Sequence, residues 1–120
     1  MGLFDFFKKN DNIEINFEEI DSNEKAIALA KKRVLSPLYL MPLRFNGEES
    51  VANRLFVPPA VVKIKDGYDD IVEDLLVQGK ISGYSCTPEY KGNSFIPCKL
   101  TIVASNKEKE IVFTQTIEIW

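Results

Sequence analysis

The sequence predicts one α+β domain over residues 1–120, with a mostly antiparallel sheet that two helices cover on one face. The last forty residues alternate apolar and polar side chains in three runs separated by turn residues, which is typical of a C-terminal three-stranded antiparallel meander. Two earlier segments, 22–35 and 68–78, carry helix start signals and an apolar stripe of helical spacing. A chain of 120 residues also has the usual size of one domain.

The first segment, residues 1–12, is predicted to be a short amphipathic stretch followed by a linker. Its apolar and basic side chains are Leu3, Phe4, Phe6, Phe7, Lys8 and Lys9. The segment could pack on the domain, or it could make weak contact with a membrane surface through residues 3–9. Directly after it, Ile13, Ile15 and Phe17 alternate with polar residues and predict a strand.

The helix over 22–35 is predicted to begin after Asp21, a residue type that caps free amide groups. Its apolar stripe consists of Ala26, Ile27, Ala30 and Val34. Ser36-Pro37 is expected to end it, because the residue before a proline avoids the helical conformation.

The middle of the chain predicts short strands. Residues 38–45 form the first, Asn46-Gly47 is a hairpin turn signal, and a partner strand is expected within 51–57. Pro58-Pro59 is expected to stop that strand. A further short strand is predicted over 61–65.

The second helix, 68–78, is predicted to begin at the cap residue Asp66 and to end at Gly79, which suits a left-handed residue after a helix. With the strands on either side, it would form a strand–helix–strand unit. Its carboxylates are predicted to make an acidic face that could dock a basic partner or hold a divalent cation, or that is an ordinary solvated surface. The residues of this face are Asp69, Asp70, Glu73 and Asp74, of which Asp70, Glu73 and Asp74 are the candidate docking residues.

In the meander, strands over 80–90, 94–105 and 110–117 are joined by turns centred on Gly92 and on Lys107-Glu108. When both turns are taken as symmetric, one set of apolar side chains shares a face, which is predicted to be the core. These are Tyr84, Cys86, Cys98, Leu100, Ile102, Ala104, Ile111, Phe113, Ile117 and Ile119. The opposite face is rich in Thr, Ser and Lys, as expected of a solvated sheet.

The same register places Cys86 directly opposite Cys98 in neighbouring strands. Their Cβ atoms would then lie about 4.5–5.5 Å apart, close to the range of a strained disulfide. Two interpretations follow: a redox-sensitive thiol pair, or two small hydrophobic side chains in a core.

An aromatic patch is predicted at one end of the solvated face of the meander, where the register brings Phe95 close to Trp120. Aromatic side chains are enriched at the cores of protein interfaces, so this end could be an interaction patch. Cover by a loop such as 46–60 is the alternative.

The chain has no histidine, which removes the commonest general base and the commonest metal ligand. Phosphate-binding loops, dinucleotide fingerprints and other catalytic motifs are also absent, so we predict no catalytic, cofactor-binding or metal-ligating residue. A net charge of −3 and the lack of a basic stripe argue against nucleic-acid binding. The sequence has no stretch of about 18 apolar residues, so integral membrane contact is not expected. Two cysteines without a secretory signal favour a cytoplasmic location.

These observations favour a non-catalytic protein-binding or regulatory module, of the general character of bacterial immunity or adaptor proteins. Its partner would be another protein or a second copy of the chain. The alternative is a small-ligand-binding or cysteine redox-responsive protein, with a pocket between the sheet and the helices.

Overall fold

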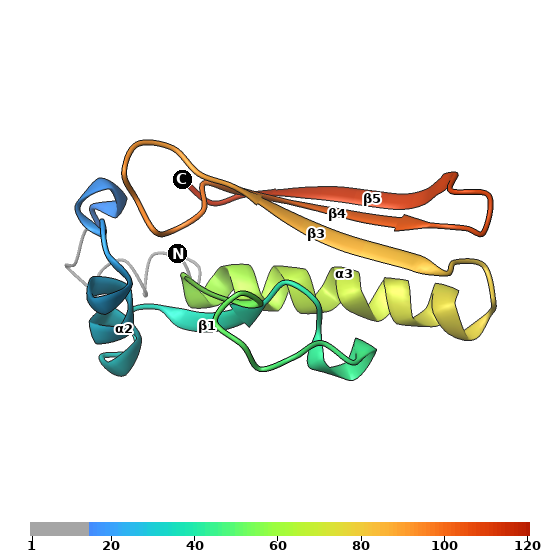
Figure 1. Cartoon of the computed structure of the whole chain (residues 1–120), viewed down its shortest axis with the longest axis horizontal. Coiled ribbons are helices and arrows are strands. Elements are labelled where there is room, and N and C mark those ends of the chain that lie inside the picture. The colour runs from blue at the N-terminus through green and yellow to red at the C-terminus, as the bar shows by residue number, and fades with distance from the viewer. Residues whose placement is uncertain (1–14) are drawn as a thin grey trace, which may run out of the picture.

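The computed structural model describes residues 15–120 and confirms the α+β class. Two helices accompany a two-stranded and a three-stranded antiparallel sheet in this part of the chain (Figure 1). The meander is confirmed, with strand order β3-β4-β5. The elements are α2 (Asn23–Lys31), β1 (Ser36–Tyr39), β2 (Arg54–Val57), α3 (Pro59–Val77), β3 (Gly83–Glu89), β4 (Lys99–Ser105) and β5 (Ile111–Glu118), with 3-10 helices at Phe17–Glu19 and Leu43–Phe45.

Helix α3 begins nine residues earlier than predicted and replaces the strand expected over 61–65, so the strand–helix–strand unit was wrong. Pro59 stands in the first turn of the helix, where a missing N–H is tolerated and the fixed φ suits the helix. A buried stripe then runs along the whole helix at spacings of three and four residues: Val61, Lys65, Asp69 and Val72. Gly79 ends it as predicted, with a positive φ of 73°.

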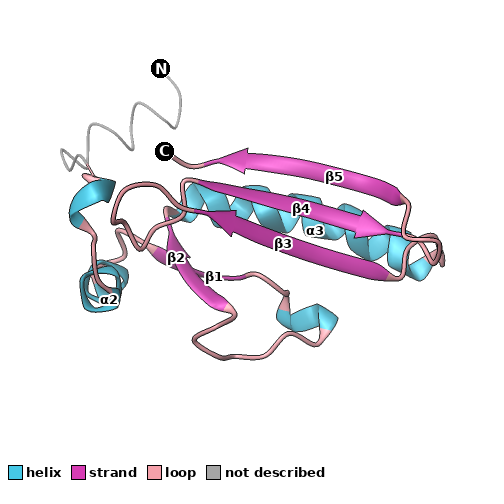
Figure 2. Cartoon of the chain, turned by 45° about the horizontal axis from the view of Figure 1, so that its top comes forward, coloured by secondary structure: helices cyan, strands magenta, loops and turns pink. Residues whose placement is uncertain are grey.

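Helix α3 alone runs along the apolar face of the meander, with β1 on its other side (Figures 1 and 2). Helix α2 lies at one end of the molecule, where it builds a second cluster with Ile20, Leu35 and Ile96. The expectation that both helices cover one face of the sheet was therefore wrong for α2.

Helix α2 is also shorter than predicted, and its cap is Ser22, not Asp21. The Ser22 hydroxyl accepts the Lys25 N–H at 3.2 Å, while the Asp21 carboxylate binds the Lys25 ammonium at 2.8 Å. The helix ends because Arg33 adopts a positive φ of 63° and the Val34 N–H turns back to the Leu29 carbonyl at 3.0 Å.

The expected antiparallel pair in the middle of the chain is present as β1 and β2, but no tight turn joins them. Leu43–Phe45 forms a 3-10 helix and Asn46 closes it with a φ of 69°. The Asn53 side chain holds the loop together, accepting the Met41 N–H at 2.7 Å and donating to the Met41 carbonyl at 2.9 Å. Only glycine fits at Gly47, because a Cβ there would collide with that carbonyl.

Near the beginning of the described part, the predicted strand through Ile15 and Phe17 was wrong: Phe17–Glu19 is a 3-10 helix. Ile13 and the amphipathic segment 1–12, including the membrane-contact residues 3–9, lie outside the described residues.

The meander has the predicted apolar face but not the predicted registers. Cys86 lies opposite Ile102, and Leu100 lies opposite Ile117. Both registers differ from the prediction by an even number of residues, and an even shift keeps every side chain on its face. Five of the predicted core residues are accordingly buried: Cys86, Leu100, Ile102, Ala104 and Ile117. Ile111 is the exception, at 64% exposed, because a bulge between Ala104 and Ser105 shifts it out of phase.

Candidate functional site

A groove of about 430 Å³ lies where α2, β2 and the loop between β3 and β4 come together. Three segments that are distant in the sequence supply its walls. They contribute Asn23, Ala26, Val51, Arg54, Leu55, Phe56, Tyr90, Ser94 and Phe95. We call this the Arg54 groove.

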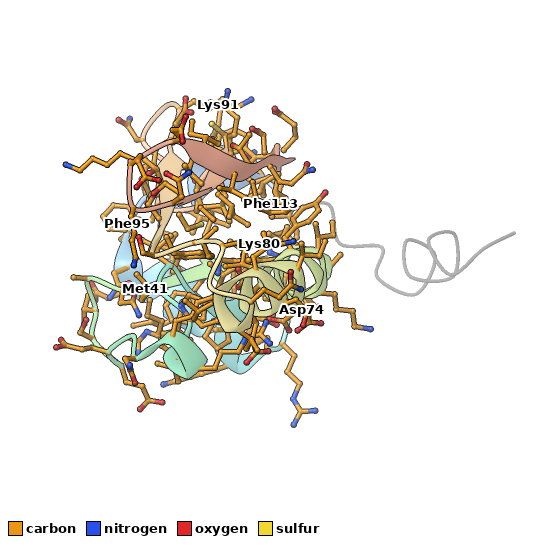
Figure 3. The ribbon with its side chains drawn as sticks, turned by 90° about the vertical axis from the view of Figure 1, so that its right-hand side faces the viewer. Met41, Asp74, Lys80, Lys91, Phe95 and Phe113 are labelled. Atoms are coloured by element: carbon orange, nitrogen blue, oxygen red, sulfur yellow. The ribbon has the colours of Figure 1, made fainter. Side chains whose placement is uncertain are left out.

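The apolar side chains of the Arg54 groove are unusually open to solvent. Phe95 is 50% exposed, Tyr90 47% and Val51 71%. Figure 3 shows Phe95 at the margin of the molecule. An open cluster of this kind, with aromatic members, is typical of an interaction site and not of scattered surface residues.

The backbone around Phe95 is fixed, so its exposure is imposed by the fold. Its N–H donates to the Ile20 carbonyl at 2.7 Å, and the next residue, Ile96, is fully buried. The Ser94 hydroxyl accepts the Ile96 N–H at 3.0 Å. These contacts anchor the loop to the second cluster and leave the Phe95 ring in the groove.

Arg54 supplies the charge of the groove. Its guanidinium carbon lies 5.3 Å from the centre of the Phe56 ring, in cation–π range. The Nε atom is buried and has no hydrogen-bond partner among the described residues. None of the ion pairs within residues 15–120 includes Arg54. A buried donor without a partner costs free energy, and the rest of the guanidinium is not engaged by any carboxylate of the described residues.

The predicted aromatic patch is divided by the structure. Phe95 lines the Arg54 groove, whereas Trp120 stacks on Phe17 at 5.2 Å between ring centres and donates its indole N–H to the Ile96 carbonyl at 3.1 Å. The Lys91 ammonium lies 4.6 Å from the centre of the Trp120 ring. Trp120 therefore helps to close the second cluster, and Phe95 is the part of the predicted patch that lies in the groove.

The direct pairing of Cys86 with Cys98 was wrong. Cys86 faces Ile102, and both thiols are free. The observed register puts Cys98 four residues further along the strand pair, about 13 Å away at 3.3 Å per residue. A disulfide needs Cα atoms within about 7 Å, so this arrangement forms no cross-strand bond. Burial raises the pKa of the Cys86 thiol to about 11.

The predicted acidic face is partly engaged within the chain. Arg44 donates to the Asp70 carboxylate at 2.7 Å and to the Glu73 carboxylate at 3.2 Å. The hydrogen bond to Asp70 raises the pKa of Arg44 above its ordinary value. Asp74, labelled in Figure 3, lies exposed on α3.

A buried polar cluster of Lys65, Asp69 and Tyr84 was missed by the sequence analysis. The Lys65 ammonium donates to the Asp69 carboxylate at 2.7 Å and to the Tyr84 hydroxyl at 3.0 Å. The Tyr84 hydroxyl donates to the other Asp69 oxygen at 2.7 Å. Burial, followed by the hydrogen bond to Asp69, raises the pKa of Tyr84 far above its ordinary value.

Each member of this cluster contacts both of the others, so its main effect is to fix α3 against β3. Phe45 packs its edge against the Tyr84 ring at 5.4 Å. A small hollow of about 220 Å³ borders Lys65 and Asp69 on the side of β1. The cluster could have been predicted from the four-residue spacing of Lys65 and Asp69, which lie on the same helical stripe as Val61 and Val72.

Within residues 15–120, no group of three or more Cys, Asp or Glu side chains is placed to hold a metal ion. No helix of the described part has the length and apolar character needed to cross a membrane. Comparisons with protein-family models, with curated proteins and with solved structures found no match.

Proposed function

We propose that this chain is a non-catalytic protein-binding module whose Arg54 groove takes a short segment of a partner protein. The segment carries a carboxylate next to a large apolar side chain. The carboxylate pairs with the Arg54 guanidinium, and the apolar side chain contacts Phe95 and Tyr90. The observation that carries the proposal is the Arg54 guanidinium, which no carboxylate within residues 15–120 pairs with, beside half-exposed aromatic rings.

The composition of the groove supports a protein partner. Tyr, Phe and Arg are enriched at interface cores, and a few such residues supply most of the binding energy. Arginine is the residue that binds a carboxylate through two parallel hydrogen bonds. The guanidinium already has one face against the Phe56 ring, which lowers the entropy lost when a ligand fixes it.

Arg44 offers an internal comparison for this argument. It also lies over a ring, with its guanidinium carbon 5.6 Å from the centre of Phe45, but Asp70 and Glu73 of the same chain already bind it. The two arginines therefore share an aromatic neighbour and differ in whether a carboxylate is supplied from within residues 15–120. In our proposal, the partner supplies to Arg54 what α3 supplies to Arg44.

The experiment is selection from a random peptide display library with the intact chain as bait. We expect enriched peptides to place Asp, Glu or a terminal carboxylate next to Phe, Leu or a similar side chain. A synthetic peptide from the selection should lose at least about tenfold in affinity with Arg54→Met and with Phe95→Ala, because a charged hydrogen bond or an aromatic anchor is worth more than about 1.4 kcal/mol. Arg44→Met is the matched control and should leave the affinity unchanged.

Two results would overturn the proposal. One is a selection that enriches no carboxylate-containing peptide. The other is a selected peptide whose affinity is the same for the intact chain and for Arg54→Met. Raising the salt concentration gives an independent check, since a carboxylate–arginine contact at a partly open groove should weaken.

A further inference from the structure

Among residues 15–120, strand β5 pairs with β4 alone and so forms an edge of the three-stranded sheet (Figure 2). The Ile119 N–H donates to the Cys98 carbonyl at 2.8 Å, which identifies this opposed pair as hydrogen-bonded. In an antiparallel ladder the hydrogen-bonded pairs alternate, so Phe113, Gln115 and Ile117 bond to β4. The backbone N–H and C=O groups of the residues between them point away from the sheet. These residues are Thr114, Thr116 and Glu118.

This edge has few of the features that usually prevent strand pairing. Open edges are commonly protected by short length, by proline or by lysine. The other edge strand, β3, contains Pro88, whereas β5 has eight residues without proline or lysine, and Glu118 is its only charge. The bulge lies at Val112, which has no opposed residue in β4 between the pairs Ala104–Phe113 and Ser105–Ile111. Residues 113–118 therefore offer a regular, nearly uncharged strand.

The side chains of this strand match a second copy of themselves. Antiparallel pairing about Gln115 sets Thr114 against Thr116, Phe113 against Ile117 and Val112 against Glu118. This register places no like charges opposite each other and joins apolar residues on the side that faces α3. It also uses the regular residues 113–117 on both sides of Gln115. Pairing centred on Thr114 would instead oppose Ile117 to Ile111, which the bulge has turned out of phase.

We propose that two copies of this chain associate through β5, which pairs antiparallel with its own copy about Gln115 to form a continuous six-stranded sheet. The partner is a second copy of the chain, and the contact is made mainly by backbone hydrogen bonds from Thr114 and Thr116. This inference does not depend on the Arg54 groove.

The first test is the mass of the protein in solution by analytical ultracentrifugation. We expect the intact chain to sediment at twice its chain mass of 13.7 kDa. Thr116→Pro removes an N–H that points away from β4, so the meander keeps its ladder while the dimer loses two central bonds. We expect this variant to sediment at the single chain mass. An intact chain that stays at the single mass at high micromolar concentration would overturn the proposal.

The second test does not depend on the folding of a proline variant. In the proposed register Gln115 lies opposite its own copy at a non-hydrogen-bonded position, with Cα atoms about 4.5 Å apart, within disulfide range. The Gln115 side chain is exposed, so Gln115→Cys should fold normally. With diamide as the oxidant, we expect Gln115→Cys to accumulate covalent dimer on a non-reducing gel.

Single-site controls distinguish this register from random collision. In the proposed register residue 118 lies opposite Val112 of the other copy, so Glu118→Cys alone should give no more covalent dimer than the intact chain. The intact chain also shows how much cross-linking the two native thiols produce. A mixture of Thr114→Cys and Thr116→Cys, which lie opposite each other in this register and are both exposed, should form the mixed dimer. If Gln115→Cys cross-links no faster than Glu118→Cys alone, the proposed register is wrong.

Discussion

Lys65 and Arg54 are two basic side chains beside aromatic rings, and they lie in opposite kinds of surroundings. The Lys65 side chain is 3% exposed, sits 5.5 Å from the centre of the Tyr84 ring and bonds to both Asp69 and Tyr84. Arg54 lies against Phe56 at the wall of an open groove, with a buried Nε that has no partner among the described residues.

Lys65 therefore stabilises the fold, whereas in our proposal Arg54 is available to bind a partner. A buried charge is tolerated when its hydrogen bonds are made inside the chain, and removing one partner then destabilises the fold strongly. A cation whose bonds are not made internally adds little to stability and is available to a ligand. The buried cluster should therefore be sensitive in unfolding experiments and the Arg54 groove in binding experiments.

The largest expected effect comes from Asp69→Leu, which leaves the Lys65 ammonium buried without its carboxylate. We expect the free energy of unfolding to fall by about 3–5 kcal/mol. Urea denaturation followed by circular dichroism measures it. The control is Asp70→Leu at the neighbouring, 68% exposed side chain, whose ion pair with Arg44 should contribute at most about 1 kcal/mol.

The double variant Lys65→Met/Asp69→Leu sharpens this test. With both charges removed and similar volumes retained, most of the lost stability should return, because no unpaired charge is left in the core. If Asp69→Leu alone costs no more than Asp70→Leu, then the cluster does not hold α3 against β3 and the comparison with Arg54 fails.

The second expected effect is a fall in the free energy of unfolding at alkaline pH, which arises from buried groups near the Lys65 cluster. In the folded chain burial raises the pKa of Cys86 from 9.0 to about 11, so the folded thiol keeps a proton that the unfolded thiol releases. The unfolded state then binds fewer protons between these values, and the free energy of unfolding falls as pH rises from 9 to 11, by on the order of 2 kcal/mol. The raised pKa of Tyr84 acts in the same direction above its ordinary value of 10.0.

Urea unfolding at pH 8, 9 and 10 measures this decline. Cys86→Ala should make it shallower, whereas Cys98→Ala should leave it as steep as in the intact chain. An equal decline in the intact chain and in Cys86→Ala would show that Cys86 is not the titrating group in this range.

The same comparison explains what the sequence could predict. The core face of the meander was predicted although both turns were misplaced, because a shift of two or four residues does not change which side chains share a face. The buried cluster was missed because Pro58-Pro59, which does follow the end of β2, was not also recognised as the start of a helix. Lys65 was thereby assigned to a strand and Asp69 to a helix, so their shared helical face was not visible.

The Arg54 groove was out of reach of local patterns. Its walls come from α2, from β2 and from the loop before β4, and only the folded chain brings these segments together. The sequence predicted Phe95 as a candidate interaction residue because the assumed meander register placed it on the outer face of the sheet. Nothing local to Arg54 shows that no carboxylate of residues 15–120 pairs with its guanidinium, since that depends on where every acidic residue of this part of the fold lies.

The smallest expected effect is the one that most sharply separates the two regions. Arg54→Met removes a cation–π contact worth about 0.5–1 kcal/mol and also removes a buried N–H that has no partner. The two contributions oppose each other, so the free energy of unfolding should change by less than about 0.5 kcal/mol. Urea denaturation under the conditions used for Asp69→Leu measures it.

A large loss of stability in Arg54→Met, comparable to that of Asp69→Leu, would mean that Arg54 makes structural contacts equivalent to those of Lys65. The peptide-binding experiment would then be confounded by unfolding, and the groove would lose its claim to a free cation. An unchanged stability combined with lost peptide affinity is the result that only a binding residue gives, because a structural residue cannot lose its role without a cost to the fold.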